Sequence, residues 1–239
     1  MAPSKSVALA SSKTLAEMLV LGDAVQHPVF LIFENGAGIA WRDGTLVRGG
    51  QHQINGYQVV KFCTGYRQVC EVLELHRGMG YPFLGFRDMD AAEVSARTGL
   101  DHSGAELAKE RLSTEPIVWH GDDALFARFK NSLAEYGLTV QSGGRFHHVS
   151  SGAAKSAALS YLVGQLRYEL GIRPTILACG DAPNDLELID NADHALIFPQ
   201  RSGGYISNNA RQVLHASKAG PRDWLHGVQD ILTNHRECA

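Results

Sequence analysis

The sequence predicts an α/β fold: a doubly wound, mostly parallel, Rossmann-like sheet core with an inserted α+β cap domain. Residues 7–36 alternate strand, polar turn, helix and strand patterns, and the same alternation returns after residue 155. The residues between about 60 and 150 lose this rhythm. We therefore predict that residues 1–60 and 150–239 form one core domain and that residues 61–149 form the cap.

The amino-terminal segment has the pattern of a β-α-β unit. An apolar run at Val7–Ala10 is followed by the polar turn Ser11-Ser12-Lys13-Thr14, and apolar residues with helical spacing begin at Leu15. A second apolar run at residues 28–33 ends at Glu34-Asn35-Gly36. We expect two parallel strands joined by a right-handed crossover.

The rest of the chain divides into shorter elements. Before residue 150 we expect an α+β block, and after it a return to alternating helices and strands. Extended patterns occur at residues 57–63, 81–86, 116–119, 138–140, 145–149, 175–179 and 194–198, and helical patterns at residues 66–77, 90–112 with a break at Thr98-Gly99, 122–136, 155–166 and 185–189.

Composition excludes some classes of function. Lys and Arg total 22 against 25 for Asp and Glu, and no block of like charge occurs, so we expect no broad nucleic-acid or anionic-membrane binding. No run of 18 apolar residues occurs, the first residues do not resemble a signal peptide, and the four cysteines form no CxxC pair. We expect a cytoplasmic protein with free thiols.

The sharpest motif is Gly180-Asp181-Ala182-Pro183-Asn184-Asp185, directly after the apolar run at residues 175–179. Ligands bind at the carboxyl ends of strands in open parallel sheets, so Asp181, Asn184 and Asp185 are candidate site residues. Their carboxylate and amide oxygens suit Mg²⁺ better than zinc. The alternative is that Asp181 and Asn184 cap the following helix, but capping needs only one such residue.

Other candidates lie at comparable positions. Ser11 and Ser12 end the first strand and precede a helix, where hydroxyls and free backbone N–H groups hold phosphate; the alternative is a serine N-cap. Lys155 opens the helix after the inserted block and is a candidate for neutralising phosphate, or else a surface lysine. Asn35-Gly36 either borders the same crevice or is a plain turn.

Together these motifs resemble the haloacid-dehalogenase superfamily. Ser11 matches the hydroxyl of its second motif, Lys155 matches the third-motif lysine, and Gly180–Asp185 matches the fourth motif at every fixed position. Within the superfamily the chain is most similar to the mannosyl-3-phosphoglycerate phosphatases. The residues that carry this resemblance are Ser12–Thr14, Phe33–Ala37, Gly85-Phe86, Thr98–Leu100, Gly143–His147 and Gly180–Asp185.

The family's first motif, Asp-x-Asp-Gly-Thr, is missing. In the family its first aspartate attacks phosphorus, Mg²⁺ neutralises the phosphate oxygens, and water later hydrolyses the aspartyl-phosphate. The segment Arg42-Asp43-Gly44-Thr45 has Trp41 at the nucleophile's position, so we interpret Asp43 as a turn residue. A strand and its crossover need roughly 30 residues ahead of Ser11, and we therefore expect the sequence to begin within the family's second strand.

The resemblance implies a Mg²⁺-dependent phosphatase that converts a phosphorylated sugar glycerate into mannosylglycerate and phosphate. It implies catalytic roles for Lys155 and Asp181, phosphate binding by Ser11, Ser12, Lys155 and Asn184, substrate binding by Asn35, Gly36, Arg145 and His147, and metal binding by Asp181 and Asp185. We expect Arg145 and His147 to share one face of the last cap strand, or else to lie on a solvated strand. The choice between mannosyl and glucosyl substrates stays open, and the alternative function is non-catalytic binding of a phosphosugar or a protein partner.

Overall fold

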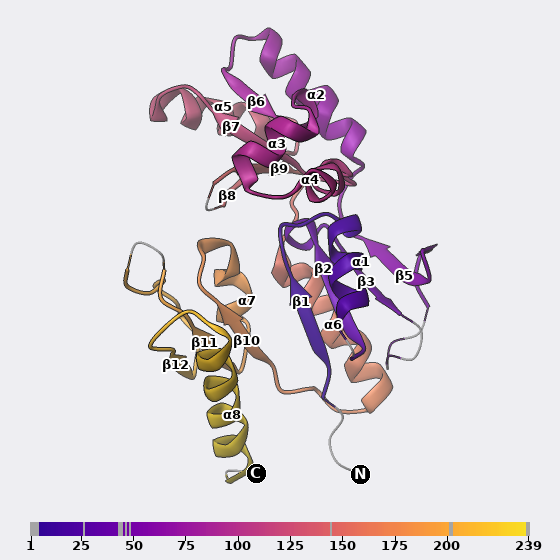
Figure 1. The fold of residues 1–239 in the computed structure, drawn as a ribbon, viewed down its shortest axis with the longest axis vertical. Helices are drawn as coiled ribbons and strands as arrows, with labels where there is room; N and C mark the ends of the chain where they lie inside the picture. The colour runs from indigo at the N-terminus through magenta and orange to yellow at the C-terminus, as the bar shows by residue number, and fades with distance from the viewer. Residues whose placement is uncertain are drawn as a thin grey trace. The chain divides into compact units, whose positions relative to one another are not determined.

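The structure is a computed structural model that describes residues 5–25, 27–42, 45, 47, 49–143, 145–200 and 203–237 (Figure 1). The chain divides into two compact units, Met1–Ala158 and Leu159–Ala239, called the first and second unit below. Both combine sheets with helices, so the predicted α/β fold class is confirmed. The core and cap boundaries near residues 60 and 150 stay a prediction. Within the described residues no helix is long and apolar enough to cross a membrane.

The first unit contains a mixed five-stranded sheet. Its strand order is β1-β2-β3-β5-β4, with β1 and β2 parallel as predicted and the other neighbours antiparallel. Only a tight turn links β2 to β3. Parallel neighbours need a longer crossover connection, so β2 and β3 pair in antiparallel fashion. The strands are β1 (Val7–Ala10), β2 (Val29–Phe33), β3 (Gly38–Arg42), β4 (His52–Ile54) and β5 (Tyr57–Lys61).

Helix α1 (Leu15–Ala24) follows β1 and covers this sheet. Thr14 is its N-cap residue: the Thr14 hydroxyl accepts a hydrogen bond from the Glu17 backbone N–H, and the Glu17 carboxylate accepts one from the Thr14 N–H. This capping box satisfies two N–H groups that the first turn leaves unpaired. Leu15 and Met18 of α1 then pack on the sheet, whose second strand β2 is buried along its whole length.

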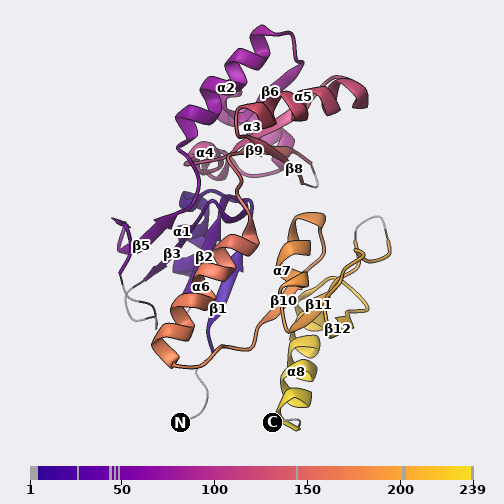
Figure 2. The same cartoon turned by 180° about the vertical axis from the view of Figure 1, so that it is seen from behind.

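The first unit also contains an antiparallel four-stranded sheet, in the order β6-β7-β9-β8. Helices α2 and α5 cover one of its faces through apolar side chains, and α3 and α4 cover part of the other in the same way. Figures 1 and 2 show the ribbons of these helices beside the sheet. The elements are α2 (Tyr66–Gly78), β6 (Phe83–Gly85), α3 (Ala91–Thr98), α4 (His102–Lys109), β7 (Glu115–Trp119), α5 (Asp123–Glu135), β8 (Thr139–Ser142) and β9 (His147–Ser150). This agrees with the α+β pattern expected for the middle of the chain.

The second unit is built on a parallel three-stranded sheet in the order β10-β11-β12. Ile189 of α7 packs with Ala195 and Ile197 of β11, whereas Gly227 of α8 lies against Leu196, which points to the opposite face. The elements of this part are β10 (Leu177–Gly180), α7 (Leu186–Asp190), β11 (His194–Ile197), β12 (Val213–His215) and α8 (Pro221–Glu237), and helix α6 (Lys155–Leu170) runs across the boundary between the units.

Candidate functional site

The turn after β1 is joined to the turn after β2 by backbone hydrogen bonds. The Asn35 N–H donates to the Ser11 carbonyl at 2.9 Å, and the Glu34 N–H donates to the Lys13 carbonyl at 2.8 Å. The Lys13 N–H donates to Ser11 Oγ at 3.3 Å. The structure therefore brings Ser11 and Asn35 together at the carboxyl ends of the parallel strands β1 and β2, where an open α/β sheet places its ligands.

The first helix is not capped by a serine. Thr14 occupies the N-cap position, so Ser11 and Ser12 lie outside the helix and the serine N-cap alternative is wrong. The backbone carbonyl of Ser12 accepts a hydrogen bond from Arg111 Nη1 at 3.0 Å.

Lys155 is buried next to this pair of turns. It is the first residue of α6, and its exposed fraction is 5%, so the alternative of a solvated surface lysine is wrong. Gly36 adopts φ of 95°, and a Cβ atom built on it would lie 2.1 Å from the Ala154 carbonyl oxygen and 2.6 Å from the Lys155 backbone nitrogen. Glycine is therefore required for the β2–β3 turn to approach the start of α6.

Asp181, Asn184 and Asp185 lie in the second unit, in the loop after β10. Asp185 Oδ2 accepts weak hydrogen bonds from the N–H groups of Asp181 at 3.4 Å and Ala182 at 3.3 Å, so this carboxylate shapes the loop. Asp181 is exposed, and neither Ala182 nor Asp185, the residues that precede the short helices here, makes a side-chain cap hydrogen bond. Helix capping by Asp181 therefore does not explain the motif.

Asp181 also lines an open pocket of about 380 Å³ in the second unit. The other lining residues are apolar or small, and Trp224 is 46% exposed there. Trp224 was not among the predicted site residues, because the sequence patterns did not indicate α8. The remaining residues around this pocket are Phe198, Ala219, Gly220 and Pro221.

The donor set of this loop fits Mg²⁺ and does not fit a closed zinc site. Among the described residues no group of three or more His, Cys, Asp or Glu side chains is placed to hold a metal ion. Structural zinc sites need four protein ligands, but Mg²⁺ is commonly held by one or two carboxylates together with water and substrate phosphate. Asp181 and Asp185 supply two carboxylates of this kind within one loop.

Arg145 and His147 do not share a strand face, which corrects our prediction. Strand β9 begins at His147, so Arg145 precedes it, and Arg145 Nη1 donates to the Thr98 carbonyl at 2.6 Å. His147 Nδ1 lies 3.1 Å from Ser142 Oγ, and its ring packs against Phe126 on the side covered by α5. The loop that turns into β9 thus directs the two side chains to different neighbours, and their roles in substrate binding stay predictions. Asp43, predicted to be a turn residue, lies outside the described residues.

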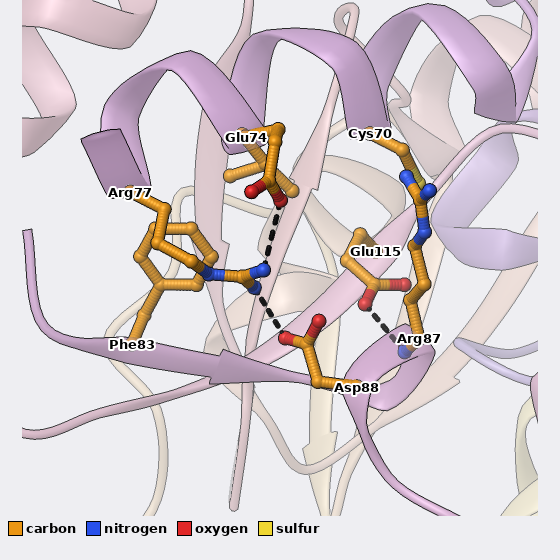
Figure 3. Close-up of a pocket in the computed structure, with 8 residues that line it drawn as sticks. Cys70, Glu74, Arg77, Phe83, Arg87, Asp88 and Glu115 are labelled. Carbon is orange, nitrogen blue, oxygen red and sulfur yellow. Dashed lines mark hydrogen bonds and ion pairs between the residues drawn. The ribbon is translucent and has the colours of Figure 1, made fainter.

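A small pocket lies beside the four-stranded sheet of the first unit, and hydrogen bonds and ion pairs connect the residues that line it (Figure 3). Its volume is about 10 Å³, room for about one water molecule. Glu115 accepts hydrogen bonds from the Arg87 N–H at 2.8 Å and the Tyr66 hydroxyl at 2.7 Å, and Arg77 pairs with Glu74 and Asp88. Burial raises the pKa of Glu115. This pocket is too small for a substrate.

The burial of His148 predicts that the stability of the first unit depends on pH. It is 8% exposed, and its Nδ1 has no hydrogen-bond partner among the residues that the structure describes. Burial, followed by the charges of Arg111, His147 and Lys155, lowers the pKa of His148 to about 3. Since the unfolded chain takes up a proton near pH 6.5 and the folded chain does not, the free energy of unfolding falls as pH is lowered from about 6.5 toward 3.

We expect this loss to reach about 1.4 kcal/mol per pH unit for the wild type relative to His148→Gln. Urea denaturation at pH 7, 6, 5 and 4 measures it, with His120→Gln, which changes an exposed histidine, as control. Parallel pH dependences of the wild type and His148→Gln would refute the assignment.

Comparison with known proteins finds the same fold in solved structures and a match between one stretch of this chain and a family model. Residues 123–228 match the family model of sucrose-6F-phosphate phosphohydrolase, a range that includes Lys155 and the Gly180–Asp185 loop. The chain resembles haloacid dehalogenase-like hydrolases from Bacteroides thetaiotaomicron (TM-score 0.55, 19% identity, covering 95% of this chain and 85% of that one) and from B. subtilis (0.52, 18%, 93% and 85%). It also resembles a phosphatase of the haloalkanoate superfamily from B. thetaiotaomicron (0.54, 18%, 88% and 76%).

Proposed function

We propose that this chain, which has the fold of the haloacid dehalogenase-like hydrolases, is a Mg²⁺-dependent phosphatase that acts on a phosphorylated sugar glycerate of the mannosyl-3-phosphoglycerate type. The fold itself admits many activities. The proposal therefore depends on the polar residues at the ends of its strands and on the start of α6.

The observation that carries the proposal is the buried Lys155 beside the joined turns after β1 and β2. Here the lysine lies at the start of a helix and next to the Gly36 turn, which is itself bonded to the Ser11 turn. A helix amino terminus, backbone N–H groups and a lysine together favour a phosphate dianion.

We assign roles to the remaining residues on the same chemistry. Ser11, Ser12 and Asn184 donate hydrogen bonds to phosphate oxygens, and Asn35 and Gly36 contact the rest of the substrate. Asp181 and Asp185 would hold Mg²⁺, which when bound supplies positive charge to the phosphate oxygens. Arg145 and His147 are proposed to contact the substrate's sugar or acidic part.

Hydrolysis through an aspartyl-phosphate also needs a nucleophile. Asp-x-Asp-Gly-Thr does not occur within residues 1–239. We therefore propose that turnover requires a segment carrying this motif to be joined ahead of Ser11. The alternative is a non-catalytic protein that binds a phosphosugar through the same residues.

Two observations bear on the substrate, and they point to different compounds. The motifs Phe33–Ala37 and Gly143–His147 favour mannosyl-3-phosphoglycerate, whereas the family-model match at residues 123–228 favours sucrose 6F-phosphate. Both are phosphate monoesters of molecules that contain a sugar, so they share the phosphate contacts and differ in the remaining ones.

Phosphate release tests the proposal. The 239-residue chain is compared with a chain extended by the in-frame codons upstream of Met1, each with Mg²⁺ or EDTA, on mannosyl-3-phosphoglycerate and sucrose 6F-phosphate. We expect release only by a chain with Asp-x-Asp-Gly-Thr, only with Mg²⁺, and faster from mannosyl-3-phosphoglycerate. A stop codon in place of the motif would favour the non-catalytic alternative, and preference for sucrose 6F-phosphate would replace our substrate.

A further inference from the structure

Glu34 is a buried carboxylate that binds a distant segment of the same unit. Its side chain is fully buried, and it accepts three backbone hydrogen bonds: from Leu112 at 2.8 Å, Ser113 at 3.0 Å and Thr114 at 2.7 Å. These residues connect α4 to β7. Hydrogen bonds to a charged acceptor are stronger than neutral ones, and a buried carboxylate without them would be costly.

The backbone at Glu34 has an unusual conformation. Glu34 and Asn35 adopt φ of 47° and 57°, and Gly36 follows at 95°. Residues other than glycine seldom occupy this region, and such conformations persist only where the surroundings hold them. The three bonds to residues 112–114 and the bond from the Glu34 N–H to the Lys13 carbonyl hold this one.

The same segment is fixed to the Ser11–Thr14 turn by other contacts. Arg111 Nη1 donates to the Ser12 carbonyl at 3.0 Å, and Thr14 Oγ1 donates to the Leu107 carbonyl at 2.8 Å. The turn that we propose to bind phosphate therefore contacts residues 107–114 directly and also through Glu34. These hydrogen bonds connect the two segments directly.

We propose that Glu34 is a positioning residue that couples phosphate binding at the Ser11–Thr14 turn to the order of residues 107–114, which lead into the four-stranded sheet. The inference rests on the proposed function for the phosphate site. Coupling of this kind is reciprocal: if phosphate orders the segment, an ordered segment strengthens phosphate binding by the same factor.

Hydrogen exchange with inorganic phosphate as the probe tests the coupling on the full chain. In the wild type, phosphate should slow amide exchange at residues 11–14 and also at Leu112–Thr114. Glu34→Gln keeps the size of the side chain but places an amide N–H₂ against backbone donors. It should speed exchange at Leu112–Thr114 at least 10-fold without phosphate and abolish the phosphate-dependent protection there.

Glu110→Gln is the matched control, because Glu110 is an exposed glutamate in the same segment. Arg111→Lys is a second variant, which keeps the charge but loses the guanidinium contact with the Ser12 carbonyl. It should also weaken the coupling, and it keeps the inference testable if Glu34→Gln fails to fold. Protection at residues 11–14 without protection at 112–114 in the wild type, or coupling that persists in both variants, overturns the inference. No protection at residues 11–14 overturns the proposed phosphate site and the coupling with it.

Discussion

Gly36→Ala is expected to destabilise the first unit by about 2–5 kcal/mol. A left-handed backbone costs a residue with a Cβ about 1–2 kcal/mol, and forcing an atom into a packed site adds about 1–3 kcal/mol. At Gly36 the new Cβ would lie 2.1 Å from the Ala154 carbonyl oxygen, and the neighbour is backbone, which cannot rotate away as a side chain can. The β2–β3 turn would then have to separate from the start of α6.

Gly80→Ala separates the two contributions. Gly80 has φ of 89°, close to that of Gly36, but a Cβ built on it meets no atom within 4 Å. We expect this control to cost about 1 kcal/mol. Urea denaturation of both variants measures the difference, and equal losses of stability would contradict the close approach of Gly36 to Lys155.

Asp181→Asn is expected to reduce Mg²⁺-dependent phosphate release by the extended chain at least about 100-fold. The amide keeps the shape of the side chain but removes the charge that we propose to bind the metal, and loss of one electrostatic contact in a transition state commonly costs 10²–10³ in rate. Asp181 is exposed and does not cap a helix, so folding should be unaffected.

The assay compares phosphate release over a range of Mg²⁺ concentrations. Asp230→Asn, which changes an exposed carboxylate on α8 of the same unit, should leave the rate and the Mg²⁺ dependence unchanged. If Asp181→Asn behaves like Asp230→Asn, the carboxylate at 181 is not a metal ligand and the proposed Mg²⁺ site is wrong.

Local patterns in the sequence predicted the elements that frame the candidate site. The parallel pair β1 and β2 and the start of α6 at Lys155 follow directly from apolar periodicity. Thr14 as the cap of α1 was also readable, because Thr14 and Glu17 have the spacing of a capping box, but the neighbouring serines obscured it.

Features that depend on tertiary contacts could not be predicted in this way. Strand β3 is only five residues long and lacks a clear alternation of apolar and polar residues. Glu34 reads as part of an ordinary Asn-Gly turn, since its partners at Leu112–Thr114 are far away in the sequence. The burial of Lys155 and the approach of Gly36 to the start of α6 are likewise tertiary features that no local pattern reveals.

We propose that this chain binds a phosphorylated sugar glycerate through Lys155 and a Mg²⁺ ion, and such binding needs no nucleophile. Titration calorimetry of the 239-residue chain with mannosyl-3-phosphoglycerate, with Mg²⁺ and with EDTA, tests it most directly. We predict binding that strengthens with Mg²⁺, weakens at least roughly 10-fold in Lys155→Met as a charged hydrogen bond is lost, and is undetectable for mannosylglycerate, which lacks the phosphate. Equal affinity for the phosphorylated and unphosphorylated compounds, or no binding of either, would contradict the account.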